Sequence, residues 1–204
     1  MSKNKMKIEK AIKQSREWFN FCNSSFDYAK IKPTDKNTIG AALLHLSIEH
    51  HGGISILVAN KHYGSAFALL RPQFEAFVRG AWYLHCANDK QVAGYQEYEE
   101  PPRIKELIAD IKNTPDCKNL GDVLEEIKKK IWDILCGYTH GGYYQVISRI
   151  PPNEYDEDAI IAVINQSCGI TLCTGLAFTA LISDQILKKK LVQQYDSIFD
   201  EKQA

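Results

Sequence analysis

The sequence predicts an all-α protein, folded as an antiparallel helical bundle with a small helical insertion around residues 88–118. Apolar residues recur at spacings of three and four through most segments, which is the period of an α-helix. A long alternation of apolar and polar residues is absent, and no Asn-Gly pair marks a β-hairpin. The length of 204 residues suits one domain that spans residues 1–204.

Two long helices are expected in the first third of the chain. The first covers about Lys5–Tyr28 and ends before a polar loop that contains Pro33. The second covers about Thr38–His62, because threonine is a residue type that caps helix starts. The pair Gly52–Gly53 in its middle weakens this helix or lets another backbone come close.

A third helix is expected over Ser65–Ala87, followed by the insertion. Asn88 and Asp89 interrupt the helical pattern, and two short exposed helices then cover Gln91–Glu99 and Arg103–Asn113. Asp122–Gly137 forms the next expected helix, and a glycine-rich turn ends it. One last long helix begins near Asp156 and extends past Leu187.

Composition limits the location and the partners of the protein. Lysine plus arginine (25) balance aspartate plus glutamate (25), so no global field attracts nucleic acid. The polar, lysine-rich start of the sequence is unlike a secretory signal, and we expect a cytoplasmic protein. Asn165, Thr171 and Asp184 interrupt the apolar stretch Ala159–Leu187, which favours a buried core helix and no membrane contact.

Neither a metal nor a cofactor is expected. The six cysteines form no CxxC pair and are predicted to be reduced and structural. His45 and Glu49 share a helix face as metal ligands often do, but no third ligand has a recognisable spacing. The chain contains no GxSxG, Walker or dinucleotide-binding motif, so the enzyme classes that these motifs mark are disfavoured.

The third expected helix carries a row of charged and aromatic side chains. At about 3.6 residues per turn, Arg71, Glu75, Arg79, Trp82 and His85 fall within an arc of about 120°. Glu75 is four residues from each arginine and can pair with one or both. Two interpretations stay open: an ion network that sets the helix register, or a site for a phosphate or carboxylate.

Two further features of the sequence are a proline within this row and a glycine-rich run that is predicted to form a turn. Pro72 removes the hydrogen bond to the carbonyl of Ala68, so we expect a kink and a free carbonyl beside Arg71. The run Tyr138–Gly142 (YTHGG) ends a helix, and its glycines permit positive φ and close backbone approach. His140 in this run can exchange protons near neutral pH, although a histidine at a helix end is more often structural.

The pattern ALLRPxxExxxRxxW over Ala68–Trp82, followed by YTHGG, resembles a group of bacterial proteins of unknown function that is related to the HEPN helical superfamily. The resemblance covers about Ala41 to Asp184. It implies a HEPN-like helical bundle that is often a dimer, and the aromatic side chains of Tyr138, Tyr143 and Tyr144 are compatible with a homodimer interface.

Active HEPN ribonucleases have an arginine several residues before a histidine, and this resemblance makes Arg79, His85 and His140 the catalytic candidates. Arg79 would hold the scissile phosphate, and one of the histidines would be the base in a metal-independent cleavage of RNA. The chain departs from the family at Gly80, where an Asn, Asp or His is usual. A toxin or phage-defence role would follow by analogy alone.

The preferred interpretation of the sequence is a non-catalytic binding or interaction module with a polar pocket. Arg71, Glu75, Tyr138 and Thr139 are its ligand-binding candidates, and the partner is an unknown protein or small ligand. The metal-independent ribonuclease is the alternative. Catalysis predicts that Arg79 and a histidine converge on an open cleft, whereas a structural role predicts buried, paired side chains.

Overall fold

The computed structural model describes residues 3–150 and 155–199, and within these ranges it contains helices and no strands, which confirms the all-α class. Two 3-10 helices, η1 (Tyr28–Lys30) and η2 (Pro115–Cys117), lie in connections. The α-helices are α1 (Lys3–Ser25), α2 (Asp35–Ala59), α3 (Tyr63–His85), α4 (Asp89–Gln96), α5 (Ile104–Asn113), α6 (Lys118–Thr139), α7 (Tyr143–Ile147), α8 (Glu157–Leu181) and α9 (Gln185–Phe199).

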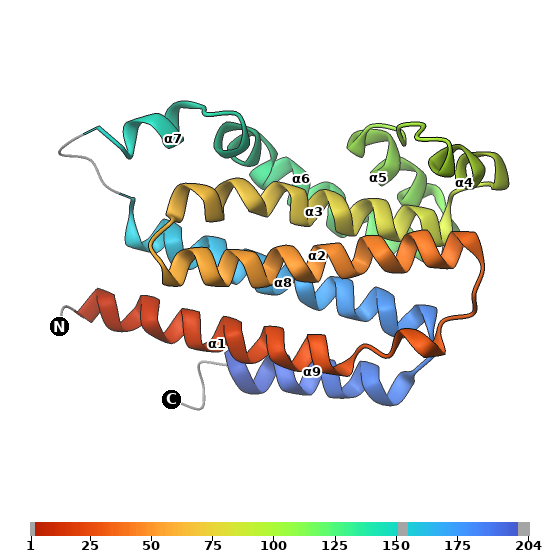
Figure 1. Ribbon diagram of the computed structural model, residues 1–204, viewed down its shortest axis with the longest axis horizontal. Coiled ribbons are helices and arrows are strands. Elements are labelled where there is room, and N and C mark those ends of the chain that lie inside the picture. The colour runs from red at the N-terminus through yellow and green to blue at the C-terminus, as the bar shows by residue number, and fades with distance from the viewer. Residues whose placement is uncertain (1–2, 151–154, 200–204) are drawn as a thin grey trace.

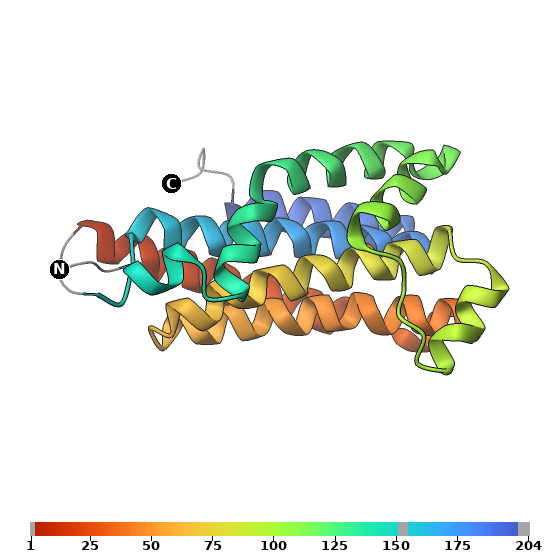
Figure 2. The same cartoon turned by 90° about the horizontal axis from the view of Figure 1, so that it is seen from above.

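Five long helices, α1, α2, α3, α8 and α9, lie side by side along the long axis of the molecule (Figures 1 and 2). Helices that follow each other in this set, α1 to α2 to α3 and α8 to α9, run in opposite directions, as predicted for an antiparallel bundle. The helix α8 packs against α1, α2, α3 and α9. The predicted insertion is present as α4, α5 and η2 at one end, and α7 lies at the other end.

Among the described helices, α8 alone is long and apolar enough to cross a membrane, with a mean hydropathy of 1.6 over its most apolar window. Half of that window, 50%, is buried inside the bundle. The core helix of a soluble protein meets the same test, and the contacts of α8 with four other helices fit that explanation. Several polar residues that interrupt the stretch, among them Ser167, Thr171 and Thr174, face the bundle interior.

The helices α2 and α3 approach closely because glycine lies on both sides of their contact. A Cβ atom on Gly80 would lie 3.1 Å from the carbonyl oxygen of Gly40 and 3.0 Å from the side chain of Leu44. The pair Gly52–Gly53 does not interrupt α2. A Cβ atom on Gly52 would lie 2.7 Å from the ring of Phe19, so this pair leaves room for neighbouring side chains.

A buried hydrogen-bond network joins α2, α3 and α8 inside the apolar core. The Gln73 amide nitrogen donates to the carbonyl oxygen of Ser167 at 3.0 Å and to the hydroxyl of Thr171 at 3.1 Å. The Ser167 hydroxyl donates to Gln73 Oε1 at 2.7 Å, and the Ser47 hydroxyl donates to the Gln73 carbonyl oxygen at 3.1 Å. These buried polar groups are hydrogen-bonded, which removes most of the cost of burying them.

His51 extends the network to α1, and its ring is fully buried. Nδ1 of His51 lies 2.7 Å from Ser167 Oγ, and Nε2 lies 3.3 Å from the carbonyl oxygen of Ser15 on α1. A carbonyl oxygen only accepts, so a proton on Nε2 makes the contact with Ser15 a hydrogen bond, whereas a proton on Nδ1 donates to Ser167. Burial lowers the pKa of His51 to about 4, while the carbonyl of Ser15 acts in the opposite direction.

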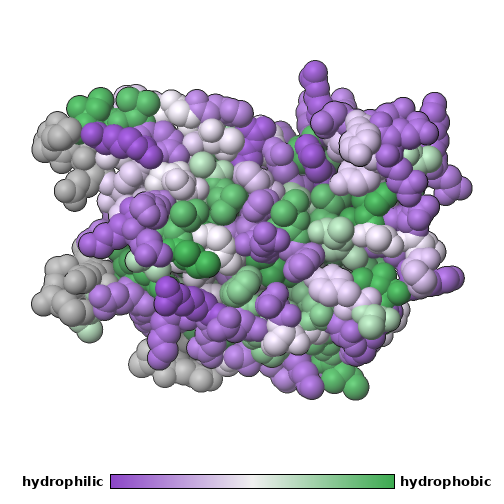
Figure 3. Space-filling model, in the orientation of Figure 1, coloured by the Kyte–Doolittle hydropathy of each residue, from purple (hydrophilic) through white to green (hydrophobic). Residues whose placement is uncertain are grey.

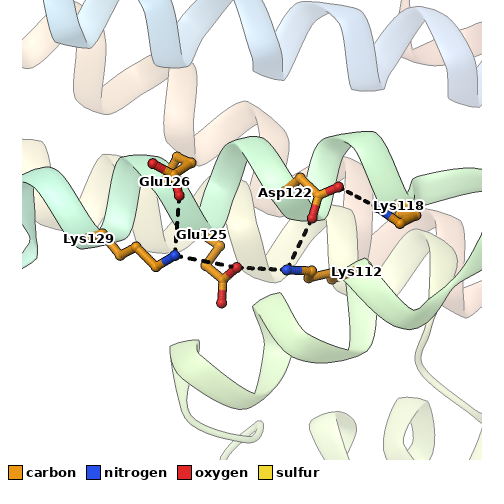
Figure 4. Close-up of polar contacts among 6 residues, drawn as sticks. All are labelled: Lys112, Lys118, Asp122, Glu125, Glu126 and Lys129. Atoms are coloured by element: carbon orange, nitrogen blue, oxygen red, sulfur yellow. Dashed lines mark hydrogen bonds and ion pairs between the residues drawn. The ribbon is translucent and has the colours of Figure 1, made fainter.

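Lysine and carboxylate side chains connect the insertion to α6 (Figure 4). Lys112 on α5 reaches across to two residues of α6, with Nζ 3.1 Å from Asp122 Oδ1 and 2.7 Å from Glu125 Oε2. Within α6, Lys118 pairs with Asp122 at 2.7 Å. The backbones also meet here, because a Cβ atom on Gly121 would lie 2.3 Å from Cα of Lys112.

Several helix boundaries differ from those expected. Thr34 and not Thr38 caps α2, with its hydroxyl accepting from the backbone N–H of Asn37 at 3.2 Å. The expected last helix is wrong: it is divided into α8 and α9 at Ile182–Asp184. Ser183 has a φ of 55°, and the carboxylate of Asp184 accepts from the backbone N–H of Leu187, which starts a new helix.

The contact between α5 and α6 predicts opposite effects for two glycines of α6. We expect Gly121→Ala to lower the free energy of unfolding by about 2 kcal/mol, because the new methyl group would collide with the α5 backbone. A Cβ atom on Gly137 would meet nothing within 4 Å, and alanine favours a helix more than glycine does. Gly137→Ala should therefore raise the free energy of unfolding by roughly 0.5 to 1 kcal/mol. Urea unfolding measures both, and equal effects would contradict the proposed contact.

The buried ring of His51 predicts that acid destabilises the fold. The unfolded chain takes up a proton near pH 6.5, whereas the folded chain does so only near its lowered pKa of about 4. The free energy of unfolding should therefore fall by about 3 kcal/mol as the pH drops through this window. In the His51→Asn variant this part of the pH dependence should disappear, and an unchanged slope in urea titrations would contradict the assignment.

Candidate functional site

The charged row of α3 lies at the edge of the bundle, where the side chains of Arg71 and Glu75 are each 21% exposed. Arg71 Nε donates to Glu75 Oε1 at 2.7 Å. Arg79 Nη2 lies 3.8 Å from Oε2 of the same carboxylate. Glu75 therefore pairs with both arginines, as its spacing allows, and forms its hydrogen bond with Arg71.

Arg71 also joins α3 to the C-terminal end of α6. Its Nη1 donates to Nε2 of His140 at 2.7 Å, and its guanidinium lies 4.9 Å above the ring of Trp132. The Nζ atom of Lys128 is 5.4 Å from the centre of that ring. A guanidinium stacked on an indole and placed at a helix C-terminus is stabilised by the ring electrons and by the helix dipole.

Pro72 and Thr139 meet at the same contact. Pro72 has no N–H, so the carbonyl of Ala68 lacks its helical partner. The Thr139 hydroxyl lies 3.4 Å from that carbonyl oxygen and 2.9 Å from the carbonyl oxygen of Leu135. Despite the proline, α3 continues as one helix, and the carbonyl left by the proline faces the predicted turn.

The run Tyr138–Gly142 forms the expected turn between α6 and α7. Gly141 has a φ of 67°, which the absence of a side chain makes inexpensive. The backbone N–H of Gly142 donates to the carbonyl of Gly137 at 2.7 Å, and a Cβ atom on Gly142 would lie 2.8 Å from Cα of Gly137. The two glycines thus supply the positive φ and the close approach that the sequence predicted.

Gln145 holds α7 on the first turn of α3. Its amide nitrogen donates to the carbonyl oxygens of Gly64 at 2.7 Å and Tyr138 at 2.8 Å. Its Oε1 accepts from Arg149 Nη1 at 2.7 Å and from the Tyr155 hydroxyl at 2.7 Å. A Cβ atom on Gly64 would lie 2.7 Å from that oxygen, so only glycine leaves room for the amide.

These contacts border an open surface cavity of about 540 Å³ between α3, the turn and α7. A cavity of this size accommodates a small molecule. Burial raises the pKa of Tyr138, whose phenol therefore stays protonated. The cavity is lined by Gly64, Ser65, Ala68, Tyr138, Thr139, Gly141, Gln145, Val146, Arg149 and Ile150.

The candidates for catalysis are distributed over two places. His140 pairs with Arg71 beside the cavity. His85 is exposed at the C-terminal end of α3, and its pKa is lowered mainly by partial burial and also by the charge of Lys36. Arg79 has only the long contact with Glu75, and its buried Nε has no hydrogen-bond partner in the described residues. Arg71 and not Arg79 is the arginine that meets a histidine.

Packing explains why Gly80 departs from the ribonuclease pattern. The residue is buried, and a Cβ atom there would touch both the backbone and a side chain of α2. An Asn, Asp or His at this position would have no space and would point into the contact between α2 and α3. Arg79 therefore lacks the polar neighbour that the HEPN motif places next to its arginine.

Two histidines of α2, His45 and His51, do not have the surroundings of metal ligands. His51 lies in the core, and the ring of His45 packs 5.1 Å from the ring of Tyr28. Within residues 3–150 and 155–199, no three side chains of the types His, Cys, Asp and Glu gather as a metal site requires.

Three residues of the site, Trp132, Gln145 and Arg149, were not expected from the sequence. Trp132 belongs to a helix whose partner helix was unknown, so its stacking on Arg71 had no local signal. Gln145 and Arg149 have the spacing of one helical turn, but α7 is a helix of only five residues and was not predicted. Gly142 just before it was the available signal, since glycine is common at helix starts.

Comparison with known proteins places this site within a matched region. A family model described as "Family of unknown function (DUF6988)" matches residues 44–202, which include α3, α6 and α7. Neither a curated protein nor a solved structure matches the chain. The relation to the HEPN superfamily thus stays a prediction.

The contacts of Arg71 predict that this arginine matters more for stability than Arg79. Arg71→Ala removes two hydrogen bonds and a cation–π contact, so we expect the free energy of unfolding to fall by about 1 to 2 kcal/mol. Arg79→Ala should cost less than about half of that, because its ion pair is long and partly exposed. Equal losses in urea unfolding would show that the contact with His140 and Trp132 is of no consequence.

Proposed function

This chain belongs to the family of unknown function DUF6988, and from the geometry of its site we propose that it is a non-catalytic binding module for a small anionic ligand. The single observation that carries the proposal is the cavity of about 540 Å³ at the junction of α3, the Tyr138–Gly142 turn and α7. Two of the ligand-binding candidates, Tyr138 and Thr139, line it. The other two, Arg71 and Glu75, lie one to two helical turns from Ala68 in its wall.

The chemistry of the walls supports an anion with an apolar body. Val146, Ile150 and the ring of Tyr138 supply apolar surface, while Arg149 is the cation in the wall. Arg71 and His140 add a second polar pair beside Thr139. Arginine is the side chain best suited to carboxylates and phosphates, because its planar fork donates two parallel hydrogen bonds.

Binding without catalysis fits the other residues of α3. No hydrogen bond joins Arg79 to His85 in the part of the chain that the structure describes, and Gly80 leaves no polar group next to Arg79. Arg71 is occupied by Glu75, His140 and the ring of Trp132, so it is a fixed element of the site. Such an arrangement orients a ligand, and the histidine beside it, His140, is already paired with Arg71.

A metal-independent ribonuclease is a second candidate, favoured by one observation. Arg71 and His140 form an arginine–histidine pair at 2.7 Å, and His140 is exposed. In this second candidate the pair replaces Arg79 and His85 as the cation and the base of the cleavage. The ligand would then be RNA.

We also propose a homodimer in the cytoplasm that associates through α7. Hydrophobic surface gathers at the α7 end of the molecule (Figure 3, top left). Tyr143 is 73% exposed, Tyr144 55%, Val146 53% and Ile150 50%. Aromatic and aliphatic side chains at this exposure are common at protein interfaces. Sedimentation that shows only monomer at micromolar concentration would contradict the dimer.

The binding proposal predicts a saturable site for phenyl phosphate, which combines an apolar ring with a phosphate. Titration of ¹⁵N-labelled protein should shift the amide signals of residues 64–68 and 138–149 first. Arg149→Ala should weaken binding about tenfold or more, because a charged hydrogen bond is lost. The matched control is Arg16→Ala, an exposed arginine on α1, which should leave binding unchanged.

Two results would decide against the binding module. The absence of saturable shifts, or equal weakening by Arg149→Ala and Arg16→Ala, would contradict a specific site. Cleavage of labelled single-stranded and transfer RNA in the presence of chelator, lost in Arg71→Ala and in His140→Ala, would favour the ribonuclease. Loss in Arg79→Ala and His85→Ala instead would return the catalytic role to the residues of the HEPN pattern.

A further inference from the structure

A second cavity, of about 580 Å³, lies between α1, α8 and α9. In Figure 1, α1 and α9 lie on the side of the bundle away from α7, with α8 between, and this cavity shares no lining residue with the site described above. None of the sequence motifs discussed above contributes to it. Its walls come from three helices that present side chains at successive turns, which places a set of polar groups around one space.

The helix α1 supplies the cations of this cavity. Lys7, Lys10 and Gln14 occupy one face of α1 at helical spacing, and both lysines are exposed. Within the part of the chain that the structure describes, neither lysine forms an ion pair. Two ammonium groups that pair with no described carboxylate attract an anion to this end of the cavity.

The helices α8 and α9 supply hydrogen-bonding groups. Asp158 and Asn165 are seven residues apart on one face of α8, and Tyr195 lines the cavity from α9. Burial raises the pKa of Tyr195, so its hydroxyl stays protonated and is able to donate. A carboxylate that accepts, a phenol that donates and an amide that does both are suited to the hydroxyl groups of a polyol.

The floor of the cavity is apolar and is held in place from two sides. Ala11, Ile161 and Phe199 line it, and the ring of Phe199 lies 4.6 Å from that of Tyr195. The side-chain amide of Gln14 donates to the carbonyl oxygen of Ile198, which connects α1 to the end of α9. The walls are thus connected independently of any ligand.

We propose that this cavity binds a phosphorylated polyol, such as a sugar phosphate. Lys7 and Lys10 take the phosphate, since ammonium groups bind phosphate as point charges. Asp158, Asn165 and Tyr195 bind the hydroxyl groups. The single carboxylate discriminates against ligands that are anionic at both ends, because a second negative charge beside Asp158 is repelled.

Glucose 6-phosphate is the probe for this proposal, with inorganic phosphate and glucose as separate arms. In ¹⁵N-labelled protein, glucose 6-phosphate should shift the amide signals of α1, α8 and α9 to saturation and leave those of α7 unchanged. Lys10→Ala should weaken binding about tenfold, because one charged contact to the phosphate is lost. Lys13→Ala is the matched control, since Lys13 is an exposed lysine of α1 outside the cavity.

The Asp158→Asn variant distinguishes binding of the sugar hydroxyl groups from binding of the phosphate. It should weaken binding of glucose 6-phosphate without weakening binding of inorganic phosphate, and circular dichroism checks that each variant is folded. The absence of saturable shifts would overturn the site, as would equal weakening by Lys10→Ala and Lys13→Ala. Equal affinity for inorganic phosphate and glucose 6-phosphate would contradict recognition of the polyol part of the ligand. None of these outcomes depends on the cavity beside α7.

Discussion

The hydrogen bonds of Gln73 set the position of α3, on which the rest of the structure depends. Its side-chain amide donates to the backbone carbonyl of Ser167 on α8 and accepts from the Ser167 hydroxyl. Its backbone carbonyl accepts from the hydroxyl of Ser47 on α2. A buried amide is stable only when these bonds are made, so α3 is held in one rotation and one register. Arg71 and Glu75, two residues away on either side, are thereby turned toward the opposite face, roughly 200° around the helix.

The fixed outer face of α3 then organises the candidate site. Arg71 contacts the C-terminal end of α6 through His140 and Trp132, and Gln145 holds α7 against the first turn of α3. The cavity forms where these pieces meet, because Gly64 leaves space for the amide of Gln145 and Gly141 turns the chain back. Structural and ligand-binding roles of Arg71 are therefore compatible: the contacts that hold α6 also orient a cation beside the cavity.

The same core makes the interior sensitive to acid while the outer helices carry the polar cavities. His51 connects α1 to the network through a ring that is stable only when neutral. The cavity between α1, α8 and α9 lies outside this network, and its lysines and carboxylate remain in contact with solvent. Ligand binding there and proton uptake in the core therefore involve different groups.

The sequence by itself determined what depends on nearby residues. The helical period predicted the all-α class and the insertion, the spacing of four predicted the pairing of Glu75 with its arginines, and the glycines of the Tyr138–Gly142 run predicted its turn. Only the tertiary structure decided which arginine meets His140, because that contact joins residues 69 positions apart. The break at Ser183 has a local signal in the capping carboxylate of Asp184. The packing of Gly80 against Gly40 depends on how helices meet, and no local pattern encodes that contact.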